Sequence, residues 1–145
     1  MGIPHFTANQ NITRAFKAVG AKKIIGVSYS RLQNELTRDY MTEAGFDVLA
    51  MEPLEVPFEK AGEISPEQVY ALVHETFTAN PKAEAIYLQG NAWRLLSIVE
   101  MMERDFGVPV IETCAALCWE IQHRIHIREP RDSIGVLMRE LPIPR

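Results

Sequence analysis

The sequence predicts an α/β protein with a three-layer, doubly wound, four-stranded and mainly parallel sheet that has helices on both faces. Short apolar runs rich in β-branched residues alternate along the 145 residues with longer segments whose apolar residues recur at helical spacing. The helical segments between strands are ten or more residues long, as right-handed crossovers between parallel strands require. We expect a strand order of 2-1-3-4 in one domain that spans residues 1–145.

The first half of the chain supplies two strands of this sheet. A stripe at helical spacing predicts the first helix, which Gly20 ends: Ile12, Phe16 and Val19. The buried run at 24–29 predicts the first strand. The second helix, at 31–44, carries an apolar face: Leu32, Leu36 and Tyr40. A second strand is expected at 46–51, and prolines and glycine make 52–64 a loop.

The second half repeats the alternation. Ser65 and Pro66, with Gln68 in a capping box, predict the start of a helix that ends near residue 80. Strands are expected at 83–88 and 108–111, each followed by a helix: the first is capped by Asn91 and the second runs from 115 to about 126. A final apolar run at 134–138 is a candidate for an additional short C-terminal strand.

Composition narrows the function classes. The chain is 47% hydrophobic and 23% charged, with a formal net charge of −4 and no long basic cluster, so nucleic acid is not an expected partner. No apolar run approaches the roughly 20 residues that span a bilayer, so no membrane partner is expected. There is no secretory signal pattern, and two cysteines four residues apart on one helix do not bridge comfortably. These features favour the cytoplasm.

Polar residues follow three of the four expected strands, at the edge where ligands bind in open α/β folds. They are Tyr29, Ser30 and Asn34 after the first strand, Gly90 and Asn91 after the third, and Thr113 and Cys114 after the fourth. Hydroxyls, amides and helix-start N–H groups suit a small carboxylate or an enolate. Neither G-x-G-x-x-G nor a P-loop is present, so no dinucleotide, and no cofactor, is expected.

Plainer interpretations stand beside these. Ser30, Asn91 and Thr113 are equally well explained as helix N-caps. Cys114 opens the last long helix and is the candidate nucleophile, although no histidine or lysine close in sequence would act as its base. Glu112 fits a cleft carboxylate or, more simply, a salt-bridged structural residue. His123 and His126 have a spacing compatible with a metal, but no third ligand is evident, so no metal site is expected.

Several stretches, in this order and spacing, also occur in a known family. Val27-Ser28-Tyr29 is followed by Gln33-Asn34-Glu35, where the family has Pro-Tyr and then Val-Asn-Glu. Gly107-Val108-Pro109-Val110 leads through Ala116 to Trp119, where the family has Gly-x-Pro-Val and then Ala-x-x-Trp, and Ile134-Gly135-Val136-Leu137 is similar to its Gly-Arg-Leu-Leu ending. The chain thereby resembles the C-terminal half of the maleate isomerase and arylmalonate decarboxylase branch of the Asp/Glu racemase superfamily.

The resemblance implies a half-site for cis–trans isomerisation, racemisation or decarboxylation of a small (di)carboxylic acid. Tyr29 matches the family tyrosine that hydrogen-bonds the substrate, and Asn34 a polar residue near it. Gly90 stands where the family has a catalytic cysteine, so Cys114 is the remaining candidate for proton transfer. A homodimer, or a partner that supplies the other half, would complete the site. The alternative is a catalytically inactive, truncated homologue that binds a carboxylate or self-associates.

Overall fold

The computed structural model describes residues 5–90 and 92–144, and it confirms the predicted fold class. Its elements, in chain order, are α1 (Ala8–Ala18), β1 (Lys23–Ser28), α2 (Arg31–Glu43), β2 (Asp47–Pro53), a 3₁₀ helix η1 (Phe58–Glu63), α3 (Pro66–Ala79), β3 (Ala85–Leu88), α4 (Leu96–Phe106), β4 (Val110–Glu112), α5 (Thr113–Arg124), a 3₁₀ turn η2 (Asp132–Ile134) and α6 (Val136–Glu140).

The four strands form one sheet in the predicted order β2-β1-β3-β4, and every pair is parallel. Strand β1 lies in the middle, with Ile25 opposite Ile86 of β3, and Ile86 in turn opposite Val110 of β4. Because all strands run the same way, β1, β3 and β4 end at one edge of the sheet. That edge carries the residues that the sequence singled out.

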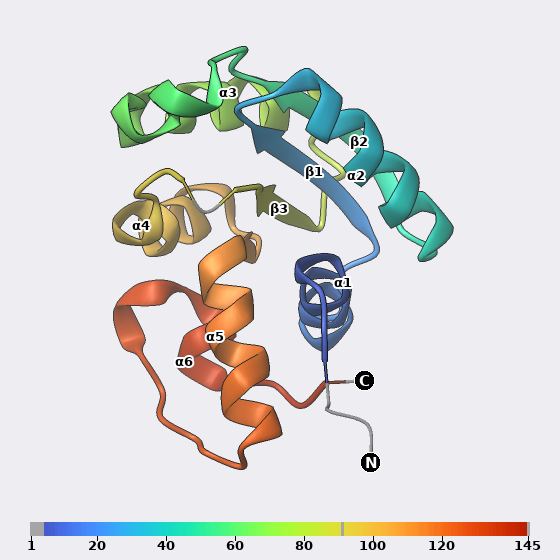
Figure 1. Cartoon of the computed structure of the whole chain (residues 1–145), viewed down its shortest axis with the longest axis vertical. Helices are drawn as coiled ribbons and strands as arrows, with labels where there is room; N and C mark the ends of the chain where they lie inside the picture. Colours follow the sequence, from blue (N-terminus) through green and yellow to red (C-terminus); the bar gives the residue numbers. More distant parts are fainter. Residues whose placement is uncertain (1–4, 91, 145) are drawn as a thin grey trace.

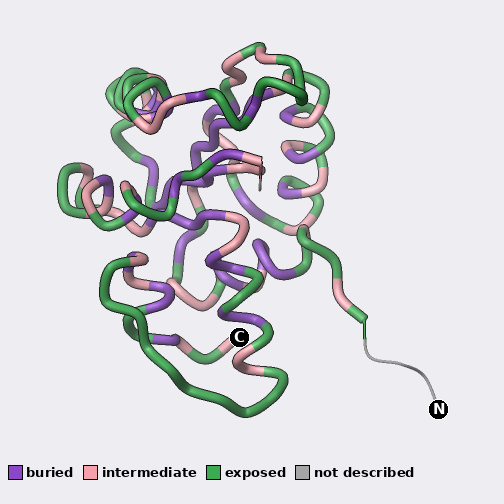
Figure 2. The backbone as a smooth tube through the Cα atoms, turned by 60° about the vertical axis from the view of Figure 1, so that its left-hand side comes forward, coloured by how far each residue is buried: buried purple, intermediate pink, exposed green. Residues whose placement is uncertain are grey.

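Helices cover both faces of the sheet (Figure 1). Buried side chains of α1, α2, α5 and α6 pack with β1 and β3 on one face, around the fully buried Phe16 and Trp119. On the other face, α3 and α4 pack over Ile25 and Ile86. Figure 2 shows that β1, β3 and β4 are almost wholly buried, whereas residues 124–133 form a long exposed segment.

Capping residues define the helix starts, and one start differs from the prediction. Thr7 caps α1 in a reciprocal capping box with Gln10. Helix α4 begins only at Leu96, and its N-cap residue is Leu95. The predicted cap, Asn91, lies outside the described residues. The start of α3 is confirmed, because Ser65 accepts the N–H of Gln68 and Pro66 occupies the first turn.

The predicted C-terminal strand is wrong. Residues 132–134 form a 3₁₀ turn and 136–140 form the short helix α6, whose Leu137 and Met138 pack into the core beside α5. A five-residue apolar run does not distinguish a strand from one buried helical turn, and here tertiary packing decides. Among the described residues, no helix is both long and apolar enough to cross a membrane.

Helix α2 turns a different face to the core than its apolar stripe indicates. Leu32 and Leu36 are 67% and 64% exposed, whereas Asn34, Thr37 and Met41 are buried. The helix packs on β1 and β2 through this partly polar face. Two large apolar side chains are therefore left in contact with solvent near the carboxyl edge of the sheet.

Candidate functional site

Tyr29 leaves β1 at the carboxyl edge and enters an aromatic cluster. Tyr29 is 4% exposed, and its ring forms a T-shaped pair with that of Trp93, with centroids 5.5 Å apart. The ring centroid of Phe58, in η1, lies 5.8 Å from that of Tyr29. These three rings come from the segments that follow β1, β2 and β3. They close the middle of the edge with apolar surface.

Gly90, which follows β3, packs directly against this aromatic cluster. Its φ of +124° suits glycine, and a β-carbon placed there would overlap the ring of Tyr29 and come within 3.1 Å of Trp93 Nε1. The indole N–H of Trp93 also donates to the Gly90 carbonyl at 3.0 Å. Two aromatic side chains therefore occupy the space into which the cysteine implied by the resemblance would extend.

Thr113 joins the ends of β3 and β4. Its hydroxyl accepts the Gly90 N–H at 3.0 Å and donates to the Leu88 carbonyl at 3.2 Å. The Tyr87 hydroxyl lies 3.5 Å from the same oxygen, and burial raises the pKa of Tyr87 to about 12. The structure therefore brings Gly90 and Thr113 together, and their mutual hydrogen bond fixes the backbone at this edge.

Ser30 and Asn34 lie on the α2 side of the edge. Ser30 is the N-cap residue of α2, but its side chain makes no capping bond. Its backbone N–H donates to the Ser28 hydroxyl at 3.1 Å. Asn34 is buried, and among the described residues neither atom of its amide has a hydrogen-bond partner. It lines a cavity of about 260 Å³ between α2 and the end of β2, together with Arg31 and Arg38.

Cys114 lies in a different cavity at the same edge, of about 300 Å³. The lining comes from the segment before and at the start of α4 and from the start of α5: Trp93, Arg94, Leu95, Leu96, Ser97, Glu112 and Cys114. Cys114 is half-buried. Burial first, and then the neighbouring Glu112, raise the pKa of its thiol to about 11. The thiol is therefore protonated at neutral pH, contrary to the activation expected from its place at a helix start.

Glu112 is not the salt-bridged residue that we expected. It is 1% exposed, and its carboxylate caps α5 by accepting the Ala115 N–H at 2.8 Å. Burial raises the pKa of Glu112, while hydrogen bonds from the start of α5 lower it. Sequence reasoning missed this carboxylate–thiol pair, although a glutamate directly before a helix is an N-cap signal that was available.

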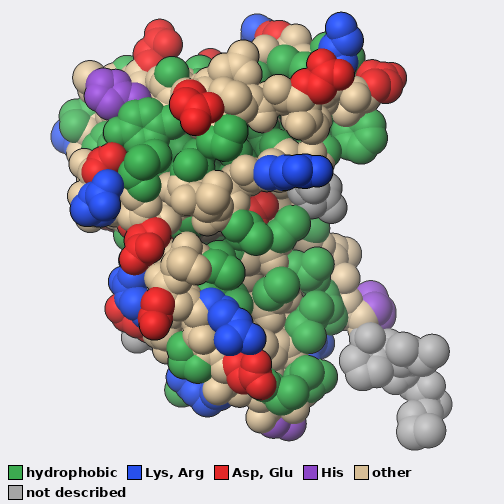
Figure 3. Space-filling model, turned by 90° about the vertical axis from the view of Figure 1, so that its left-hand side faces the viewer, with side chains coloured by type: hydrophobic (Ala, Val, Ile, Leu, Met, Phe, Trp, Pro, Cys, Tyr) green, Lys and Arg blue, Asp and Glu red, His purple; other side chains and the backbone are tan. Residues whose placement is uncertain are grey.

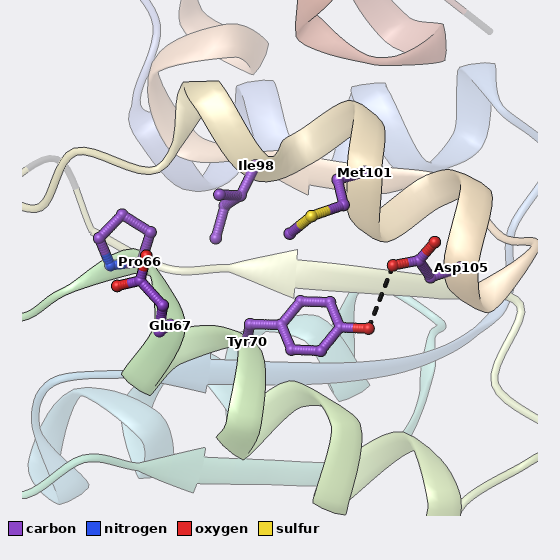
Figure 4. A pocket seen from close by; sticks show the side chains of 6 residues that line it. All are labelled: Pro66, Glu67, Tyr70, Ile98, Met101 and Asp105. Atoms are coloured by element: carbon purple, nitrogen blue, oxygen red, sulfur yellow. Dashed lines mark hydrogen bonds between the residues drawn. The ribbon is translucent and has the colours of Figure 1, made fainter.

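Another cavity, of about 230 Å³, lies between α3 and α4 (Figure 4). It is lined by Pro66, Glu67, Tyr70, Ile98, Met101 and Asp105, and the Tyr70 hydroxyl donates to Asp105 at 3.1 Å. None of the residues predicted for the site lines it. In the part of the chain that the structure describes, no three histidine, cysteine or acidic side chains are grouped to hold a metal; His123 instead packs against Trp119.

Comparison with known protein families identifies the family of the chain. The family model for arylmalonate decarboxylase matches residues 1–138. The chain belongs to the arylmalonate decarboxylase family. No curated protein matches it.

Solved structures with the same fold include maleate isomerases and arylmalonate decarboxylases. Maleate isomerase Iso from Pseudomonas putida S16 has a TM-score of 0.87 at 20% identity, with 95% of this chain and 56% of that one covered. An arylmalonate decarboxylase has a TM-score of 0.84 at 20% identity, with 92% of this chain and 60% of that one covered. A third structure is a cysteine-to-serine variant of a Nocardia farcinica maleate cis-trans isomerase with a covalently bound succinylcysteine intermediate. Its TM-score is 0.80 at 24% identity, with 92% of this chain and 55% of that one covered. The chain thus spans a little over half the length of these proteins.

Proposed function

We propose that this arylmalonate decarboxylase-family domain binds a small (di)carboxylic acid at the carboxyl edge of its sheet. It would contribute a half-site for proton transfer in isomerisation, racemisation or decarboxylation. The cavity that holds Cys114 carries this proposal, because it sets a thiol among apolar walls at the edge where ligands of parallel α/β sheets bind. Family membership supports the substrate class.

Cys114 is the proposed catalytic residue, acting as a proton donor. A thiol whose pKa is about 11 keeps its proton until a strongly basic carbon, such as that of an enediolate, forms beside it. Gly90 has no side chain for this task. Substrate-binding roles are proposed for Tyr29, Ser30, Asn34, Gly90 and Thr113, which provide hydroxyl, amide and N–H groups. The same role is proposed for Asn91, which lies outside the described residues.

We further propose that a second copy of the chain completes the site. The similar solved chains are roughly one and a half times as long or more, and this domain carries large exposed apolar side chains on α5 and at its C-cap: Leu117, Ile121 and Ile125. Figure 3 shows hydrophobic side chains gathered on the face of the molecule that lies to the left in Figure 1. Exposed apolar surface of this kind favours association.

A second candidate function is carboxylate binding without catalysis. The observation that favours it is the aromatic cluster at Gly90, where Tyr29 and Trp93 occupy the space into which a side chain at residue 90 would extend. In this alternative the edge binds an acid, or mediates self-association, and no bond to carbon changes.

Turnover separates the two functions. The chain is incubated with phenylmalonate, maleate or aspartate, and products are followed by NMR, while calorimetry measures binding. Catalysis predicts a product that Cys114→Ala abolishes and Cys118→Ala, one helical turn away, retains. Binding by calorimetry with no product from any acid would establish the alternative, and a fully active Cys114→Ala variant would exclude the thiol.

A further inference from the structure

A cavity of about 360 Å³ lies between α1 and the end of α5, which pack side by side (Figure 1). It is lined by Arg14, Glu120, His123, Arg124 and Pro144. Cys114 is at the start of α5, and a rise of about 1.5 Å per residue places Arg124 about 15 Å further along the helix. Of the described residues proposed to bind substrate, none lines this cavity.

Glu120 fixes two arginines at the cavity. Its carboxylate is fully buried and accepts the Nε–H of Arg14 at 2.9 Å through one oxygen and that of Arg124 at 2.7 Å through the other. The Phe6 ring also supports Arg124, whose guanidinium carbon lies 4.6 Å from the ring centroid. Among the described residues, the Nη groups of both arginines donate no hydrogen bond, so these N–H groups stay available to a ligand.

The charge around the cavity is positive, although the chain as a whole has a formal net charge of −4. The lining carries two guanidiniums and one carboxylate. Burial first, and then Arg128 and Arg14, lower the pKa of His123, while the Pro142 carbonyl and Glu120 act in the opposite sense. Its imidazole is therefore neutral at pH 7. The partial negative charge at the end of α5, about half an elementary charge, is smaller than the excess of guanidinium charge.

We propose that this cavity binds a tetrahedral oxyanion, either inorganic phosphate or the phosphoryl group of a small phosphomonoester. A guanidinium presents paired donors that match two oxygens of one anion. A carboxylate has only two oxygens and satisfies one such pair. A phosphoryl group has three acceptor oxygens and a charge of about −1.5 to −2 at pH 7, so it can satisfy both arginines.

The spacing of the two arginines suits one such anion. Both Nε atoms bind the same carboxylate, so they lie within about 8 Å of each other, a span that a phosphate with hydrogen bonds of about 2.9 Å on opposite sides can bridge. The cavity volume is within the range of small-ligand sites, about 300 to 1,000 Å³, which leaves room for a small ester group. An anion held here would join α1 to α5.

Titration of the wild-type chain and matched variants tests the site. Inorganic phosphate, phenyl phosphate and acetate are titrated at neutral pH and constant ionic strength, and calorimetry measures binding. We expect phosphate to saturate with a Kd of about 1 mM or tighter, and acetate to bind at least tenfold more weakly. Phenyl phosphate should compete with phosphate, and the tighter of the two identifies the free ion or the ester as the source.

Lysine variants separate the paired donors from the charge. Arg14→Lys and Arg124→Lys each keep a cation beside Glu120 but lose the paired N–H groups, so phosphate binding should weaken about tenfold or more. Arg104→Lys is the matched control, since Arg104 is an exposed arginine of α4 whose Nε lies 3.2 Å from Asp105. Its affinity for phosphate should equal that of wild type.

Two measurements on the wild-type chain do not depend on any variant. Phosphate should shift the side-chain Nε–H NMR resonances of Arg14 and Arg124 and leave that of Arg104 in place. Because a ligand that binds only the folded state stabilises it, phosphate should also raise the Tm above its value in chloride of the same ionic strength.

The inference is independent of the proposed function, since no outcome here depends on turnover or on Cys114. It is overturned if phosphate does not saturate at concentrations far above 1 mM, or if acetate binds as tightly as phosphate. It is also overturned if phosphate shifts arginine resonances other than those of Arg14 and Arg124, or if both lysine variants bind phosphate like wild type.

Discussion

Replacing Gly90 by alanine tests how the aromatic cluster closes the family's cysteine position. Two costs combine at this residue. A non-glycine residue at φ +124° is strained by about 1–3 kcal/mol. The new β-carbon also overlaps the Tyr29 ring and lies 3.1 Å from Trp93 Nε1, and overpacking in a core costs about 1–3 kcal/mol more. We therefore expect Gly90→Ala to lower the free energy of unfolding by about 2–6 kcal/mol.

Gly107 provides the control for backbone strain alone. It ends α4 with φ +70°, and a β-carbon there would meet nothing within 4 Å. Gly107→Ala should therefore cost only the left-handed conformation, about 1–2 kcal/mol. The difference between the two variants isolates the overlap with the aromatic rings.

Urea denaturation followed by circular dichroism measures both variants, and a double-mutant cycle with Tyr29→Ala identifies the side chain responsible. Removing the ring should recover about 1–3 kcal/mol of the Gly90→Ala loss, the overpacking share. The reasoning is refuted if Gly90→Ala is no more destabilising than Gly107→Ala, or if Tyr29→Ala and Gly90→Ala are additive.

Three further predictions concern a buried ion pair, pH and association. Glu120 is fully buried between the partly exposed Arg14 and Arg124, whose Nε atoms lie 2.9 and 2.7 Å from its carboxylate oxygens. Replacing both arginines by methionine leaves an unpaired buried carboxylate, so the free energy of unfolding, measured by heat or urea, should fall by about 3–5 kcal/mol. Glu120→Gln should lower it by less. Burial raises the pKa of Glu103 above its usual 4.5, so the folded state binds the proton more tightly and stability should fall as pH rises through the folded pKa; Glu103→Gln should flatten this part of the stability–pH profile, and an unchanged slope would count against it. Ile121→Glu places a charge in the exposed stripe of α5 and should convert a dimer to monomers in light scattering, whereas a wild-type monomer at high concentration would exclude self-association through this face.

The sheet could be predicted because its strands are short, continuous apolar runs that only a doubly covered sheet explains. Ile24, Ile25 and Ile86 are wholly buried, and the helices between strands are long enough to force parallel pairing. Local signals also located the start of α3, where serine, proline and glutamine occupy their preferred capping positions.

The misplaced details depend on contacts that local sequence does not encode. Leu32 and Leu36 form a regular apolar stripe, but α2 packs on the sheet through Thr37 and Met41, so the stripe faces solvent. The apolar run at 134–138 extends into α6, which packs on α5. The five residues of α6 are too few to show a helical period.

The location of the candidate site at the carboxyl edge of the sheet was predictable, but the arrangement of its side chains was not. Topology alone brought Gly90 and Thr113 together, and they are joined by a hydrogen bond. In contrast, Asn34 lines a separate cavity beside β2, and the closeness of Arg94 to Cys114 depends on a segment between β3 and α4 that has no periodic signal. The raised pKa of the thiol follows from burial, which spacing does not give.

The central claim is that Cys114 delivers a proton to the carbon of a bound carboxylic acid. Its most direct test is NMR of phenylmalonate, maleate and aspartate incubated with the chain in D₂O. The account predicts that at least one acid gives a product with deuterium on carbon, at a rate that Cys118→Ala preserves and Cys114→Ala abolishes. Equal deuterium incorporation by wild type and Cys114→Ala, or none by wild type at concentrations where the acid is bound, would contradict it.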